Sequence, residues 1–154
     1  QFVIAGAPSQ EVAFYAPYIK RQNVYLLLNK TYDLLSLSTA ALVTSGTATL
    51  ETALFKVPQV VCYKGSRISY EIAKRVINLK YISLVNLILD KEAVTELIQS
   101  DFNTKKLGQE LAKIVDPKQR DILFADYYEL ETKLGGKGAS ENAARLIFEA
   151  INGS

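Results

Sequence analysis

The sequence has 154 residues, of which 49% are hydrophobic and 22% charged, as in an ordinary soluble globular domain. Its formal net charge of +2 is too small to indicate nucleic-acid binding, so no nucleic-acid partner is expected. The single cysteine, Cys62, lies in an apolar run, which excludes an internal disulfide framework and fits a reducing cytoplasm.

The first half of the chain alternates short apolar runs with helical stretches. We expect strands at 2–7, 24–29, 41–44 and 57–63, and helices from about Ser9 and over 31–38. Short strands separated by helices predict an α/β fold, a Rossmann-like parallel sheet with helices on both faces. The domain is expected to cover residues 1–115.

The second half is expected to be mostly helical. Residues 66–78 repeat apolar side chains at helical spacing, whereas 81–89 on its own would be another strand. From Asn103 the pattern is helical, with a break at Asp116-Pro117. Residues 116–154 therefore form a helical tail, in which Ser140 caps a last helix. The apolar side chains expected to point inward on that helix are Ala144, Ile147, Phe148 and Ile151.

The candidate binding site follows the apolar run 41–43. That run stops at Thr44-Ser45-Gly46-Thr47, a cluster of turn and capping residues. We expect Ser45 or Thr47 to cap a helix there, and Gly46 to let the backbone approach a ligand because it has no Cβ. The N–H groups and the positive end of such a helix suit an anion such as pyrophosphate.

Glu51 lies one turn after Thr47 on the same face of the expected helix. A carboxylate there can accept hydrogen bonds from both ribose hydroxyls, as in other dinucleotide folds. The pattern leaves open that the turn is only a helix start and Glu51 a solvated residue. By the strand-end rule, Gly6, Ala7 and Ser9 also line the ligand side, although Ser9 fits a plain helix cap equally well.

Five ordered motifs then carry a family resemblance. They are SGTATLE at 45–51, a Pro-to-Tyr strand at 58–63, an aromatic-basic helix at 70–75, YISLVNLI at 81–88 and ELIQ at 96–99. Together they resemble the C-terminal half of the lipid-A-disaccharide synthases, which are bacterial glycosyltransferases of the GT-B fold. Val85 departs from the pattern, because the family usually has proline there, and this leaves the path of that loop open.

The resemblance implies a role for each motif. UDP-2,3-diacylglucosamine would bind with its diphosphate on the N–H groups of Ser45, Gly46 and Thr47 and its ribose on Glu51. Residues 83–86 would form a loop beside the donor. Ser83, Asn86 and Gln99 are candidate lining residues, and a structural role for either amide is equally open. The basic residues implied to meet anionic lipid head groups, or else to form a solvated face, are Lys64, Arg67, Lys74 and Arg75.

The implied reaction transfers 2,3-diacylglucosamine from UDP to 2,3-diacylglucosamine 1-phosphate (lipid X), forming lipid A disaccharide 1-phosphate and UDP. The sequence has no histidine, and its matching stretch has no acidic pair placed to deprotonate an acceptor. We therefore assign no catalytic residue, metal or cofactor to the chain, and expect it to be inactive alone. The general base would come from an N-terminal acceptor domain that precedes this sequence.

The same resemblance implies a cytoplasmic protein at the inner membrane, and a homodimer formed by exchange of C-terminal elements. No apolar run approaches the roughly 18 residues that span a bilayer, and Gln1 leads directly into a strand rather than a signal peptide. The alternatives are another UDP-sugar GT-B transferase or an epimerase, which lack the Tyr-x-Ser-Leu-x-Asn segment. The non-enzyme alternative is a doubly wound ligand-binding or receiver-like module. A receiver would need acidic residues at the strand ends, where the first strand has Gly-Ala-Pro.

Overall fold

The computed structural model describes residues 1–66, 80–135 and 138–152. The chain divides into two compact units, Gln1–Thr39 and Ala40–Ser154, and each has its own sheet of parallel strands. The fold is therefore α/β, with open parallel sheets flanked by helices and a C-terminal helix, as expected for half of a GT-B fold. The boundary expected at 115/116 stays a prediction.

The first unit pairs two parallel strands. Strand β1 (Phe2–Gly6) runs beside β2 (Val24–Leu28), with Phe2 opposite Val24 and Gly6 opposite Leu28. Helix α2 spans Thr31–Leu37, as expected, but α1 covers only Val12–Tyr15. Its N-cap is Glu11, so the expectation that Ser9 begins this helix is wrong.

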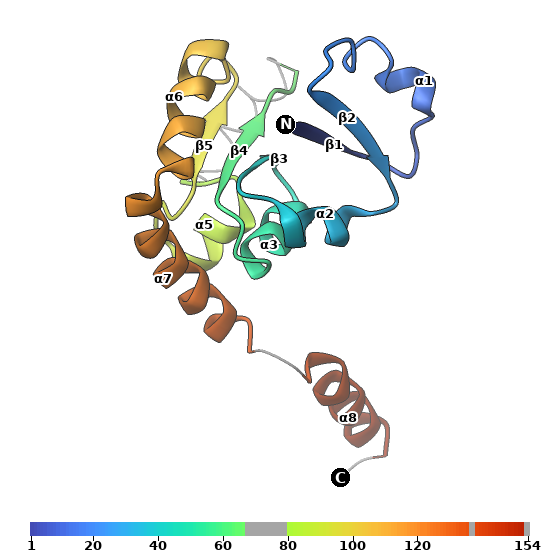
Figure 1. Cartoon of the computed structure of the whole chain (residues 1–154). Coiled ribbons are helices and arrows are strands. Elements are labelled where there is room, and N and C mark those ends of the chain that lie inside the picture. Colours follow the sequence, from blue (N-terminus) through green and yellow to red (C-terminus); the bar gives the residue numbers. More distant parts are fainter. Residues whose placement is uncertain (67–79, 136–137, 153–154) are drawn as a thin grey trace. The chain divides into compact units, whose positions relative to one another are not determined.

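The second unit is a three-stranded parallel sheet in the order β3-β4-β5 (Figure 1). Its strands are β3 (Ala41–Thr44), β4 (Gln59–Tyr63) and β5 (Thr95–Ile98). Its helices are α3 (Thr47–Leu54), α5 (Leu84–Leu89), α6 (Thr104–Val115), α7 (Pro117–Lys133) and α8 (Ala139–Asn152).

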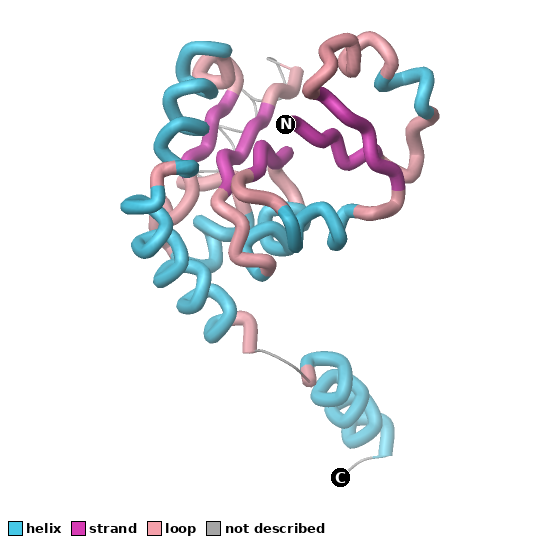
Figure 2. Tube along the Cα trace, viewed as in Figure 1, coloured by secondary structure: helices cyan, strands magenta, loops and turns pink. Residues whose placement is uncertain are grey.

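Alternate residues of β4 divide the core of this unit into two layers. Val60 and Cys62 pack with Leu97 against side chains of α6, including Leu107 and Ile114. Val61 faces the opposite way, into a layer built from α3, α5 and α7 in which Tyr127 and Leu130 are fully buried. The central strand is apolar on both faces because helices cover both faces, which Figure 2 shows as helical layers on either side of the strands.

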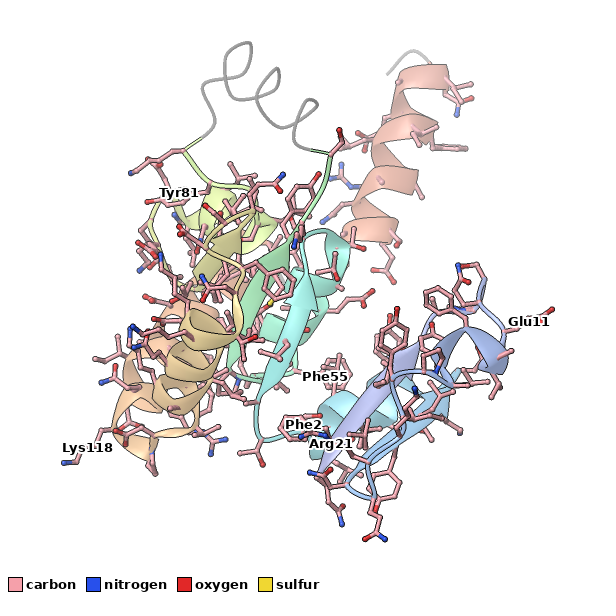
Figure 3. The ribbon with its side chains drawn as sticks, turned by 90° about the horizontal axis from the view of Figure 1, so that it is seen from above. Phe2, Glu11, Arg21, Phe55, Tyr81 and Lys118 are labelled. Atoms are coloured by element: carbon pink, nitrogen blue, oxygen red, sulfur yellow. The ribbon has the colours of Figure 1, made fainter. Side chains whose placement is uncertain are left out.

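Helices α6 and α7 meet at one residue. Asp116 ends α6, and its side chain accepts a hydrogen bond from the N–H of Lys118, the residue labelled in Figure 3 that points away from this unit. Pro117 occupies the first turn of α7, where its missing N–H has no cost. The expected break at Asp116-Pro117 is confirmed.

Two expectations for helices are wrong. Residues 84–89 form α5, whereas we expected a strand or a loop over 81–89. Helix α8 begins at Ala139, which places Ser140 inside the first turn, and none of its residues is buried. The apolar side chains expected to point inward there are exposed instead, with Phe148 at 69% and Ile151 at 77%. Among the helices that the structure describes, none combines the length and the apolar composition of a membrane span.

Candidate functional site

The candidate site lies at the carboxyl ends of the three parallel strands of the second unit. Ser45 follows β3, Lys64 follows β4 and Gln99 follows β5. In open α/β sheets, ligands bind outside this edge of the sheet. The motifs at 45–51 and 96–99 follow or contain strands that run in the same direction, and the backbone of residues 82–83 forms hydrogen bonds with Ser45 and Glu96.

The turn after β3 has a glycine as its helix cap. Gly46 is the N-cap of α3 at φ 150° and ψ −164°, and no side chain caps this end. The expectation that Ser45 or Thr47 caps the helix is wrong, because the Ser45 hydroxyl donates to the carbonyl of Ile82, 2.9 Å away. The N–H of Thr49 closes the first turn on the Gly46 carbonyl at 3.1 Å. Gly46 and Thr47 are exposed, so an external acceptor can reach the start of the helix.

Glu51 is half-buried on α3, one helical turn after Thr47. The expected placement on one helix face is therefore confirmed, because residues four apart lie above one another. What Glu51 binds stays a prediction.

An acidic residue that the sequence reasoning did not single out organises the neighbouring turn. The Glu96 carboxylate accepts hydrogen bonds from the backbone N–H groups of Ile82 and Ser83, both at 2.9 Å, and from Nδ2 of Asn86 at 2.8 Å. Figure 3 labels Tyr81, the residue before this turn. The available signal was a charged residue in the short apolar strand Thr95–Ile98.

Asn86 is fully buried, and its amide is used inside the protein. Nδ2 donates to the Val94 carbonyl and to Glu96, and Oδ1 accepts from the N–H groups of Ala93 and Val94, all at 2.8 to 2.9 Å. These bonds fill both donors and both acceptor positions of the amide. The geometry supports the structural role that the sequence left open. Ser83 is also fully buried and caps α5 through the N–H of Asn86.

Gln99 joins the ends of two strands. Its N–H donates to the Tyr63 carbonyl at 2.9 Å and its Nε2 to the Gly65 carbonyl at 3.4 Å. Lys64 is exposed at the same edge of the sheet. Of the other residues expected to meet lipid head groups, all three lie outside the described residues: Arg67, Lys74 and Arg75.

Gly6 and Ala7 belong to the first unit, at the carboxyl end of β1. The N–H of Ala7 donates to the hydroxyl of Tyr15 at 2.7 Å, so this strand end is held by α1. Their expected place beside the donor stays a prediction.

The described residues offer little redox or metal chemistry. Burial raises the pKa of the Cys62 thiol, which makes it a poor nucleophile and a small buried hydrophobe. Among residues 1–66, 80–135 and 138–152, no group of three or more His, Cys, Asp or Glu side chains is placed to hold a metal ion. The chemistry available at this edge is hydrogen bonding by backbone N–H groups and by carboxylates.

Comparison with known proteins identifies relatives. Residues 9–150 match the family described as lipid-A-disaccharide synthetase. A lipid-A-disaccharide synthase of Syntrophus aciditrophicus is 39% identical over 132 residues, which is 85% of this chain and 34% of the relative. One of Hahella chejuensis is 42% identical over 131 residues, 85% of this chain and 33% of the relative. One of Geobacter metallireducens is 31% identical over 154 residues, 98% of this chain and 40% of the relative. The chain thus spans at most 40% of these relatives' length.

Proposed function

The chain belongs to the lipid-A-disaccharide synthetase family, and from this premise we propose that it is the part of such an enzyme that binds the UDP-sugar donor. The observation that supports this most is the turn at Gly46. It places a helix start without a side-chain cap at the carboxyl edge of a parallel sheet. Free N–H groups and the positive end of a helix together suit a diphosphate.

In this proposal the turn Ser45–Thr47 contributes backbone N–H groups to the diphosphate, and Glu51 accepts from the ribose hydroxyls. The same donors would stabilise the UDP leaving group as negative charge develops on it. A helix terminus contributes only about 0.3 to 2 kcal/mol to an anion. Contacts to ribose and base must therefore supply most of the affinity.

The reaction proposed for the whole enzyme is transfer of 2,3-diacylglucosamine from UDP-2,3-diacylglucosamine to lipid X. The chain has no histidine. Of the carboxylates discussed above, Glu51 is assigned to the ribose, and Glu96 binds backbone N–H groups. The base that deprotonates the acceptor hydroxyl would lie in another part of the enzyme. We expect no disaccharide formation by this chain alone, and turnover in a radiolabelled product assay would contradict this division of labour.

Two further proposals concern partners. Lys64, with the basic residues that follow it in sequence, would contact anionic head groups at the inner membrane. The exposed apolar side chains of α8 would pack on another part of the enzyme or on a second subunit. Vesicle co-sedimentation with and without anionic lipid tests the first, and sedimentation equilibrium tests the second.

Calorimetric titration of the chain with UDP, and in parallel with ADP, tests the donor site. We expect UDP to bind better than ADP, and Glu51→Ala to weaken UDP binding by about 1 kcal/mol or more. Glu131→Ala is the matched control, since its carboxylate pairs with Lys56 on the surface and such pairs contribute little. Equal binding of UDP by the parent chain and by Glu51→Ala would show that Glu51 does not contact the ligand.

A further inference from the structure

One peptide group connects the donor turn to Glu96. The N–H of Ser83 donates to Oε1 of Glu96 at 2.9 Å, and the carbonyl of Ile82, which belongs to the same peptide group, accepts from the Ser45 hydroxyl at 2.9 Å. Oε2 of Glu96 also accepts from the N–H of Ile82 at 2.9 Å. With two carboxylate oxygens on two successive N–H groups, this peptide has one orientation, because rotating it would break the bonds on both sides.

Through these bonds, Glu96 determines where the Ser45 hydroxyl forms its hydrogen bond. The carboxylate polarises the peptide group through its N–H, and this strengthens the carbonyl as an acceptor for the Ser45 hydroxyl. Since that hydroxyl is bound to Ile82, it does not turn back to cap α3, and the first N–H groups of the helix stay open to a ligand. The turn therefore owes its form to a residue on β5, two strands away from β3 in the sheet.

We propose that Glu96 is a positioning residue of the donor site, which orients the Ile82–Ser83 peptide and through it Ser45 and the diphosphate-binding turn. The choice of UDP as the ligand rests on the proposed function, whereas the hydrogen bonds that connect Glu96 to Ser45 do not depend on it. Asn86 supports the same carboxylate from a fully buried position, which fixes Oε1 from a second direction.

Glu96→Gln is the sharpest variant, because it keeps the shape and replaces one acceptor oxygen with a donor that opposes a backbone N–H. Ser45→Ala removes the other end of the connection, and Ser45→Thr retains the hydroxyl. Glu110→Gln is the control, since that carboxylate also contacts β5, through the Thr95 hydroxyl at 3.2 Å, but lies on α6.

We expect Glu96→Gln and Ser45→Ala each to lower UDP affinity by about fivefold or more, since each loses a charged or buried hydrogen bond. The double variant should bind UDP at most about twofold more weakly than the single variant with the lower affinity. The two losses overlap because both residues act through one peptide group. Ser45→Thr, which keeps the hydroxyl, should lose less affinity than Ser45→Ala, and Glu110→Gln should bind as the parent chain does. Losses that multiply in the double variant, or parental affinity in Glu96→Gln with only a lower melting temperature, would overturn the proposal.

A readout without ligand separates this inference from the donor-site proposal. The ¹H and ¹⁵N chemical shifts of the Gly46 and Thr47 amides, measured by NMR without ligand, should change in Glu96→Gln relative to the parent chain and stay unchanged in Glu110→Gln. If the parent chain fails to bind UDP while these amides respond, the donor-site proposal fails and the positioning role stands. If these amides do not respond, the positioning role is refuted whatever the affinity for UDP.

Discussion

Replacing Gly46 by alanine tests how the donor turn is built. A Cβ added at Gly46 would meet no heavy atom within 4 Å, so crowding contributes nothing to the cost. The cost comes from the backbone, because φ 150° with ψ −164° lies in a region that only glycine populates readily. Holding alanine there costs about 1 to 3 kcal/mol.

The size of the effect allows a folded variant to be measured. Against a typical domain stability of about 5 to 15 kcal/mol, the loss leaves the chain folded. We expect the melting temperature to fall by about 3 to 10 °C in calorimetry. If the turn relaxes to escape the strain, the N–H groups at the start of α3 change direction and UDP binding is lost as well.

Gly108→Ala is the matched control for this substitution. Gly108 lies inside α6 and a Cβ there also meets no heavy atom within 4 Å, but the backbone is helical. Alanine should raise stability there by about 0.5 to 1 kcal/mol. A Gly46→Ala variant that is as stable as the parent chain, or that gains stability as Gly108→Ala does, would refute the argument from backbone conformation.

Two further substitutions test the core beside the site. Asn86→Ala should lower the free energy of unfolding in urea by about 3 kcal/mol or more, because the buried N–H and carbonyl of Val94 lose their partner. The control is Asn103→Ala, which removes an exposed helix cap and should cost about 1 kcal/mol. Similar losses for both variants would contradict this prediction. Burial raises the pKa of Tyr127 above its ordinary value of 10.0, so the folded state favours the neutral phenol over the tyrosinate. The stability that the neutral phenol contributes is fully present below pH 10 and is lost as the pH rises above 10. Tyr127→Phe should be less stable at pH 7 by about 1 kcal/mol, because the hydrogen bond to the Val57 carbonyl is lost. Its free energy of unfolding should also fall less steeply above pH 10 than that of the parent chain. Parallel plots of unfolding free energy against pH would refute the burial argument.

The sequence predicted two of the three strands of the second unit, since the short apolar runs at 41–44 and 59–63 are bounded by turn residues. It did not predict β5, because Thr95–Ile98 is short and contains a charged residue. It failed at 81–89, because a short apolar run rich in Ile and Leu does not distinguish a strand from a buried helix. The helix signals there were local: Ser83 as N-cap and Asp90 at φ 52° as the residue after the last turn.

At the candidate site, the sequence placed the turn and the following helix correctly but assigned the wrong cap. The hydroxyl of Ser45 satisfies the local rule for a helix cap, yet it binds a carbonyl 37 residues further along the chain. Glu96 was missed for the same reason, since its three partners, the N–H groups of Ile82 and Ser83 and the amide of Asn86 on α5, lie 10 to 14 residues earlier in the chain. Contacts between distant motifs decide both cases, and local patterns carry no information about them.

Gln59 bears on how the sheet finds its correct register. Because β4 is buried on both faces, shifting it by one residue would exchange one apolar face for the other at little hydrophobic cost. Gln59 prevents this: its Nε2 donates to the Thr49 carbonyl at 2.9 Å and to the Tyr127 hydroxyl at 3.3 Å. After a shift, that amide would face the apolar layer under α6 without partners. One buried polar side chain thus distinguishes the native alignment of the central strand from its neighbours during folding.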